Sequence, residues 1–181
     1  MKETPLCRLA AKWDCDKTPL IRHGYTPYYD SLLRGRQVGR VLEIGVAGGA
    51  SMRMWKEYFC LPPAEIFGID NDPSHIFQAD HIHTVLCDAG DSSGLAAVAT
   101  EFGGGFDLIL DDGSHYPDQQ VAAFRALLPF LAPGGIYIIE DVSQIEQVSN
   151  QISFPHEIHR FNKCSNPSDD SLIVFFNEEK E

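Results

Sequence analysis

Two short clusters of polar residues each follow an apolar run that we expect to form a buried strand. Asp112 and His115 follow one run, and Glu140 and Asp141 follow the next. If the two strands are neighbours in a parallel sheet, they lie about 4.8 Å apart and their carboxylates meet at one edge. Carboxylate oxygens suit Mg²⁺ or Mn²⁺, which keep positions open for water or hydroxyl groups. The spacing therefore predicts a metal site made by Asp112, Glu140 and Asp141.

His115 stands three residues after Asp112, beside this predicted metal site. A divalent ion lowers the pKa of a hydroxyl that coordinates it, as it does for bound water. An imidazole, with an ordinary pKa of about 6.5, can accept the proton near neutral pH. The pattern indicates metal-assisted activation of a hydroxyl, with His115 as the catalytic general base. An ordinary turn with solvated acids is the alternative, and we assign the neighbouring Asp111 to a loop or to the cofactor side.

A second candidate site is a turn of small residues after the first predicted strand. Glu43, Gly45 and Gly49 fit the pattern Glu-x-Gly-x-x-x-Gly, whereas the dinucleotide fingerprint G-x-G-x-x-G is not matched. Glycines in such a turn let the backbone approach a ligand closely. Asp70 ends the next strand, at the edge where an open α/β sheet binds its ligands. A carboxylate at that position can accept both ribose hydroxyls of a nucleoside.

The turn resembles the first motif of class I S-adenosylmethionine-dependent methyltransferases, with Ala47 in place of the middle glycine. The run Pro133-Gly134-Gly135 is similar to another signature of these enzymes. The resemblance implies S-adenosylmethionine as the cofactor and places the adenine near Asp88. It implies the following cofactor-binding residues: Glu43, Gly45, Gly49, Asp70, Asp88 and Ala89. Neither the turn nor Asp70 alone separates this cofactor from NAD, so the inference depends on all the motifs occurring in this order.

The metal cluster resembles that of the magnesium-dependent sugar O-methyltransferases of macrolide and aromatic polyketide biosynthesis. The resemblance implies that the acids Asp112, Glu140 and Asp141 bind the metal and that His115 is the general base. It extends upstream to Asp16-Lys17 and to residues 23–29. Well-known members carry a separate N-terminal domain, which we do not expect in this sequence, and we expect the connection after Asp141 to be short. The reaction type is therefore better supported than the acceptor.

Three hypotheses follow from these motifs. In the first, the protein is an S-adenosylmethionine-dependent and Mg²⁺- or Mn²⁺-dependent O-methyltransferase acting on a small hydroxylated substrate, such as a natural-product sugar. In the second, it is a non-catalytic cofactor-binding or assembly module with the same fold, which would bind the cofactor without transferring a methyl group. In the third, it is an NAD-dependent oxidoreductase, which would bind nicotinamide in competition with adenosylmethionine.

The elements that must position these residues alternate along the chain, as in an α/β fold. Apolar runs predict strands over 38–45, 64–70, 83–87, 106–110 and 135–139, and helical spacing predicts helices over 51–59, 93–102 and 118–131. We expect a Rossmann-like, doubly wound, mostly parallel sheet of seven strands that ends in a C-terminal antiparallel hairpin over 157–161 and 172–176. Residues 1–37 are expected to form a helical cap on a methyltransferase domain over 38–181. Its segment 14–27 is placed to fold over the ligand end.

Composition excludes several classes of partner. The chain has 181 residues with 14 Lys and Arg against 26 Asp and Glu, a formal charge of −12. An acidic chain lacks the basic surface that nucleic acid and anionic membranes require. Five cysteines without a C-x-x-C pair, and no basic leader followed by an apolar stretch, indicate reduced thiols and a cytoplasmic location. A homo-oligomer remains open.

Overall fold

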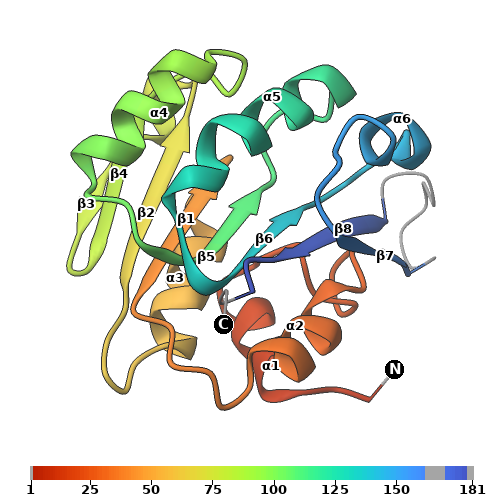
Figure 1. The fold of residues 1–181 in the computed structure, drawn as a ribbon. Coiled ribbons are helices and arrows are strands. Elements are labelled where there is room, and N and C mark those ends of the chain that lie inside the picture. The colour runs from red at the N-terminus through yellow and green to blue at the C-terminus, as the bar shows by residue number, and fades with distance from the viewer. Residues whose placement is uncertain (1, 162–169, 179–181) are drawn as a thin grey trace.

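The computed structural model describes residues 2–161 and 170–178, which form a sheet covered by helices on both faces (Figure 1). The sheet has eight strands in the order β3-β4-β2-β1-β5-β6-β8-β7. Its parallel part consists of β1 (Arg40–Ile44), β2 (Glu65–Asp70), β4 (Ile82–Leu86), β5 (Phe106–Asp111) and β6 (Leu131–Ile139). The antiparallel part consists of β3 (Gln78–Ala79), β8 (Ser171–Phe176) and β7 (His156–Arg160).

The predicted doubly wound sheet with a C-terminal antiparallel hairpin is confirmed. The additional strand is the two-residue β3, which is too short to leave a hydrophobic pattern in the sequence. The predicted connection between the two hairpin strands spans residues 162–171, of which 162–169 lie outside the described residues.

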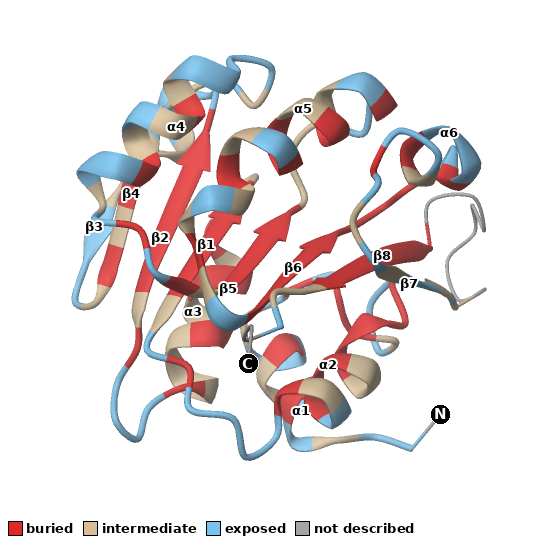
Figure 2. Cartoon of the chain, in the orientation of Figure 1, coloured by how far each residue is buried: buried red, intermediate tan, exposed pale blue. Residues whose placement is uncertain are grey.

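Helices cover the two faces of the sheet separately. One face carries α1 (Pro5–Lys12), α2 (Tyr25–Leu33) and α3 (Ala50–Tyr58), and the other carries α4 (Ser92–Glu101), α5 (Pro117–Leu127) and α6 (Ile145–Ser149). The strands between them are largely buried (Figure 2). Because side chains alternate along a strand, Val41 packs with the first group of helices, whereas Leu42 and Ile44 pack with the second. The same alternation turns Glu43 toward the face of α1, α2 and α3.

Two helices differ from the sequence-based expectation. The helix predicted over 118–131 ends at Leu127, continues as the 3₁₀ turn η2 (Leu128–Phe130), and gives way to β6 at Leu131. Pro129 has no backbone N–H to donate, so the α-helical ladder cannot continue through it. The connection after Asp141, expected only to be short, contains the five-residue helix α6. A further 3₁₀ turn, η1 (Pro73–His75), follows β2.

The N-terminal helices belong to the same hydrophobic core as the sheet. Leu6 of α1 and Tyr29 of α2 are fully buried in one cluster with Trp55 of α3 and Ile138 of β6. The chain between α1 and α2 is therefore held close to the carboxyl ends of β5 and β6. Within residues 2–161 and 170–178, none of the helices has the length and apolar character that a membrane crossing requires.

Candidate active site

The predicted acids meet where β1, β5 and β6 end. The backbone N–H of Asp112 donates to the carbonyl of Ile44 at 3.0 Å, and the N–H of Glu140 donates to the carbonyl of Asp111 at 2.9 Å. These bonds join the three strand ends. One oxygen of Asp112, one oxygen of Asp141 and one ring nitrogen of His115 all lie within 4.8 Å of one another. The structure thus brings two of the three predicted metal ligands together with the predicted base.

Asp141 is held from the N-terminal segment. The hydroxyl of Tyr25 donates to Asp141 Oδ1, and His23 Nε2 lies 3.6 Å from Asp141 Oδ2. Burial and the neighbouring charge of Asp112 raise the pKa of Asp141, although Tyr25 and His23 act in the opposite direction. A buried carboxylate that repels its neighbour is stabilised by a cation placed between the two.

Lys17, which the sequence indicates only as part of the upstream resemblance and without a role, belongs to this site. Its side chain is 2% exposed, and its ammonium group donates to Asp112 Oδ2 and, at 2.7 Å, to Glu140 Oε2. Glu43 Oε1 lies 3.5 Å from the same nitrogen. Burial by itself lowers the pKa of Lys17, but the three carboxylates outweigh it and hold that pKa well above its ordinary value. The prediction that segment 14–27 folds over this end of the sheet is confirmed by these contacts.

A signal for Lys17 was present in the strand pattern. Alternation along β1 and β6 turns Glu43 and Glu140 to the same buried face, and two buried acids require a cation nearby. Lys17 is the lysine of segment 14–27, which we expect to fold over the ligand end of the sheet. The pattern does not show which acids Lys17 contacts, because Lys17 and Asp112 are 95 residues apart in the chain.

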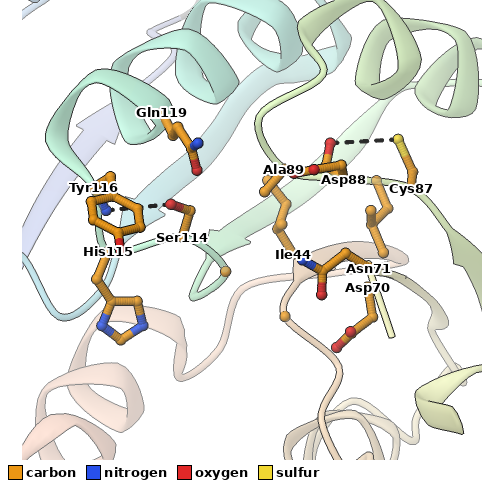
Figure 3. A pocket seen from close by; sticks show the side chains of 13 residues that line it. Ile44, Asp70, Asn71, Cys87, Asp88, Ala89, Ser114, His115, Tyr116 and Gln119 are labelled. Carbon is orange, nitrogen blue, oxygen red and sulfur yellow. Dashed lines mark hydrogen bonds between the residues drawn. The ribbon is translucent and has the colours of Figure 1, made fainter. Parts of the chain in front are cut away.

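A cavity of about 700 Å³ is lined in part by His115 (Figure 3), and its volume is within the range typical of small-molecule sites. Gly45, Asp70, Asp88 and Ala89, four of the predicted cofactor residues, line it. His115 lines it from the opposite side, where Ser114, Tyr116 and Gln119 are also found. Glu43 and Gly49 do not line the cavity. His115 is therefore common to the cavity and to the group of acids.

The glycine turn is shaped by close backbone contacts. Gly45 has a φ of +90°, and a Cβ atom there would lie 2.2 Å from the carbonyl oxygen of Asp112. Ala47, which replaces a glycine of the family motif, adopts a φ of +45°, the left-handed region that glycine favours. Gly49, with a φ of +74°, begins α3 as its N-cap. The turn therefore keeps a glycine-type backbone at all three positions.

Asp70 organises this turn from the neighbouring strand. Its Oδ2 accepts hydrogen bonds from the backbone N–H groups of Val46 and Ala47, each at 2.9 Å, and its Oδ1 accepts from that of Asp72 at 2.8 Å. Burial raises the pKa of Asp70, but these amide donors and His75 more than offset it and the pKa is lowered. Asp70 stays ionised at the cavity wall, where it fixes the turn.

Two further acids are buried on opposite faces of the sheet. Glu43 is fully buried against Lys17, and burial raises its pKa to about 7. Asp111 lies on the other face, where the hydroxyl of Tyr137 donates to it at 3.5 Å, and burial also raises its pKa to about 7. Asp111 neither lines the cavity nor joins the acid group.

The donor set fits a hard divalent cation. Asp112 and Asp141 offer oxygens within reach of one point, and Glu140 Oε1 is buried without a hydrogen-bond partner among the described residues. An acceptor buried in this way is costly unless a donor or a cation satisfies it. Cysteine is not part of this arrangement: Cys7, Cys15, Cys60 and Cys87 are free thiols in the described part of the chain.

The sequence model of the methyltransferase domain family matches residues 42–142, the span from the glycine turn to the acids after β6. This chain belongs to the methyltransferase domain family. The match covers the strands that carry Gly45, Asp70 and Asp112. It shows that the turn, the cavity and the acid group lie on a methyltransferase framework.

Two curated relatives of this methyltransferase domain are named as O-methyltransferases. One is the 8-demethyl-8-(2-methoxy-alpha-L-rhamnosyl)-tetracenomycin-C 3'-O-methyltransferase of Streptomyces olivaceus, 43% identical over 147 residues, which are 76% of this chain and 36% of that protein. The other is the mycinamicin VI 2''-O-methyltransferase of Micromonospora griseorubida, 42% identical over 151 residues, 78% of this chain and 37% of that protein. The chain thus spans well under half the length of each.

A solved structure shows the same fold with ligands. The MycE methyltransferase of the mycinamycin pathway, in complex with Mg and SAH, superposes with a TM-score of 0.68 at 37% identity. The alignment covers 80% of this chain and 39% of that one. A second complex of MycE also contains mycinamycin VI.

Proposed function

We propose that this methyltransferase domain transfers a methyl group from S-adenosylmethionine to a hydroxyl of a small molecule in a Mg²⁺-dependent reaction, with a sugar of a natural product as the acceptor class. One observation carries the proposal: His115 lines the cavity and also lies within 4.8 Å of the carboxylates of Asp112 and Asp141. The named activities of the relatives, and the Mg and SAH bound to MycE, support it.

Each part of the site has a separate role in this proposal. Of the proposed cofactor residues, Gly45, Asp70, Asp88 and Ala89 line the cavity, and Glu43 and Gly49 flank the glycine turn beside it. When bound, the cofactor supplies an already activated methyl group and Mg²⁺ lowers the pKa of the acceptor hydroxyl. Asp112, Glu140 and Asp141 would hold that ion. His115 accepts the hydroxyl proton at a ring nitrogen, next to both the carboxylates of Asp112 and Asp141 and the cavity.

The position of His115 also allows a second role, as a metal ligand, and the two roles predict different results for His115→Ala. As a base, His115 contributes about 10²–10⁴-fold to the rate. We therefore expect methyl transfer to polyketide glycosides to fall at least a hundredfold, while the affinities for S-adenosylhomocysteine and Mg²⁺ stay within about threefold. A ligand role would instead weaken Mg²⁺ binding. Unchanged turnover would remove His115 from the reaction.

His83→Ala is the matched control. His83 is a half-exposed histidine on β4 that pairs with Glu65 at 2.8 Å, outside the cavity. Its loss should leave turnover unchanged. If wild-type protein binds the cofactor yet transfers no methyl group to any hydroxylated acceptor, the non-catalytic module becomes the better account. The NAD-dependent alternative is not retained, because the chain belongs to the methyltransferase domain family.

Three further points stay predictions. The division into a cap over 1–37 and a methyltransferase domain over 38–181 is supported by the two helices that precede β1. A cytoplasmic location is supported by the free thiols of the described residues. Self-association, the remaining prediction about partners, is tested by sedimentation of the purified chain.

A further inference from the structure

Lys17 occupies an unusual place between the two halves of the site. Its ammonium group contacts Asp112 and Glu140, two acids of the proposed cation site. The same group lies 3.5 Å from Glu43, which stands two residues before Gly45, the first glycine of the glycine turn. It comes from the segment between α1 and α2, which is not covered by the family match over residues 42–142. Lys17 does not line the cavity, and its ammonium group cannot itself coordinate a cation.

The contacts divide the carboxylate oxygens between two neighbours. Lys17 binds Oδ2 of Asp112, whereas Oδ1 is the oxygen that faces His115, at 3.9 Å. On Glu140, Lys17 binds Oε2, and Oε1 is left buried without a hydrogen-bond partner among the described residues. Lys17 therefore contacts one oxygen of each acid and leaves the other oxygen outside its contact.

We propose that Lys17 is a positioning residue, which holds Asp112 and Glu140 by one oxygen each so that their other oxygens are presented to the cation. The proposal rests on the proposed function, because it presumes that this site binds a divalent ion. Through Glu43, Lys17 also anchors these acids to the strand that leads into the cofactor turn. A side chain that supports a ligand in this way commonly changes metal affinity by about 10–100-fold.

The competing explanation is that the ammonium group takes the place of the ion and must leave when the ion binds. The burial of Lys17 argues against it, since the side chain is 2% exposed and contacts Glu43, which is fully buried. Lys17 does not line the cavity through which ligands enter. The two explanations predict opposite effects of removing the lysine, because a competitor weakens metal binding and a positioning residue strengthens it.

The test is a titration of the purified chain with Mn²⁺, followed by electron paramagnetic resonance, and with Mg²⁺, followed by calorimetry. For Lys17→Met we expect a metal affinity at least tenfold weaker than wild type, with S-adenosylhomocysteine affinity in EDTA within threefold. Metal binding equal to or tighter than wild type would overturn the proposal. A wild-type chain that binds neither the metal nor S-adenosylhomocysteine would instead contradict the proposed function.

A double variant separates position from charge and guards against misfolding. Lys17→Met with Glu43→Gln removes one positive and one negative side chain, so the buried cluster keeps its wild-type formal charge. We expect this variant to melt close to the wild-type temperature and still to bind Mg²⁺ at least fivefold more weakly than Glu43→Gln alone, which is the reference for the loss of Glu43. Recovery of wild-type affinity in the double variant would show that Lys17 acts only through its charge and would overturn the positioning role.

Discussion

Replacing Gly45 by alanine tests the close approach between the glycine turn and the end of β5. The added Cβ would meet the carbonyl oxygen of Asp112 at 2.2 Å and its carbonyl carbon at 2.7 Å. Both are backbone atoms, so the turn or the strand end must move. The φ of +90° adds a second penalty, because an L side chain disfavours positive φ by about 1–2 kcal/mol.

The magnitude follows from three terms. Forced overlap in a packed region costs about 1–3 kcal/mol, and the backbone conformation costs about 1–2 kcal/mol. Alanine lowers the entropy of the unfolded chain, which offsets about 0.4–1 kcal/mol. We therefore expect Gly45→Ala to lower the free energy of unfolding by about 1–5 kcal/mol, measured by urea denaturation followed by circular dichroism without ligands.

Two other glycines supply matched controls for the separate terms. Gly35 has a φ of +80° with no atom near the added Cβ, so Gly35→Ala should lose only about 1 kcal/mol. Gly48 has neither a positive φ nor a close neighbour, so Gly48→Ala should be within about 1 kcal/mol of wild type. If Gly45→Ala proves no more destabilising than Gly35→Ala, the close approach to Asp112 is not a real constraint.

Two further predictions concern buried titratable groups. Burial raises the pKa of Cys15 to about 12, whereas Cys60 is exposed. Iodoacetamide at pH 8 should therefore alkylate Cys60 well before Cys15 in the native protein. Equal alkylation rates of the two thiols, measured by mass spectrometry, would contradict the burial of Cys15. The pKa of Asp111 is raised from 3.8 to about 7, so the folded state binds an extra proton between these values and loses stability as pH rises through them. The free energy of unfolding of Asp111→Asn should therefore rise relative to that of wild type across this pH window, by an amount on the order of 4 kcal/mol, measured by urea denaturation in EDTA. A difference between the two proteins that does not change with pH would contradict the raised pKa of Asp111.

The acids of the proposed cation site show why part of the site could be predicted from the sequence. Parallel strands that are neighbours must end at the same edge, so Asp112 and Asp141 had to be close once β5 and β6 were recognised. The closeness of Gly45 and Asp70 follows from the same rule, because the neighbouring parallel strands β1 and β2 end at the same edge. These residues are placed by strand order, and strand order is marked by apolar runs.

Other residues depend on packing that no local pattern records. Glu43 was assigned to the cofactor from its motif, but it is buried away from the cavity, on the face that strand alternation gives it. Lys17, His23 and Tyr25 come from a segment without hydrophobic periodicity, and their partners lie about a hundred residues away in the chain. Only the folded N-terminal segment brings them to the acids. The end of α5 was missed because helical spacing continued past Pro129.

The central claim is that one cavity of this chain binds the methyl donor beside a cation site. Calorimetric titration of the purified chain with S-adenosylhomocysteine, in Mg²⁺ and in EDTA, tests it most directly. We predict saturable binding of one molecule per chain, together with saturable binding of Mg²⁺ that is lost when Asp112 and Asp141 are both replaced by asparagine. No binding of S-adenosylhomocysteine or S-adenosylmethionine, with or without Mg²⁺, would contradict the account.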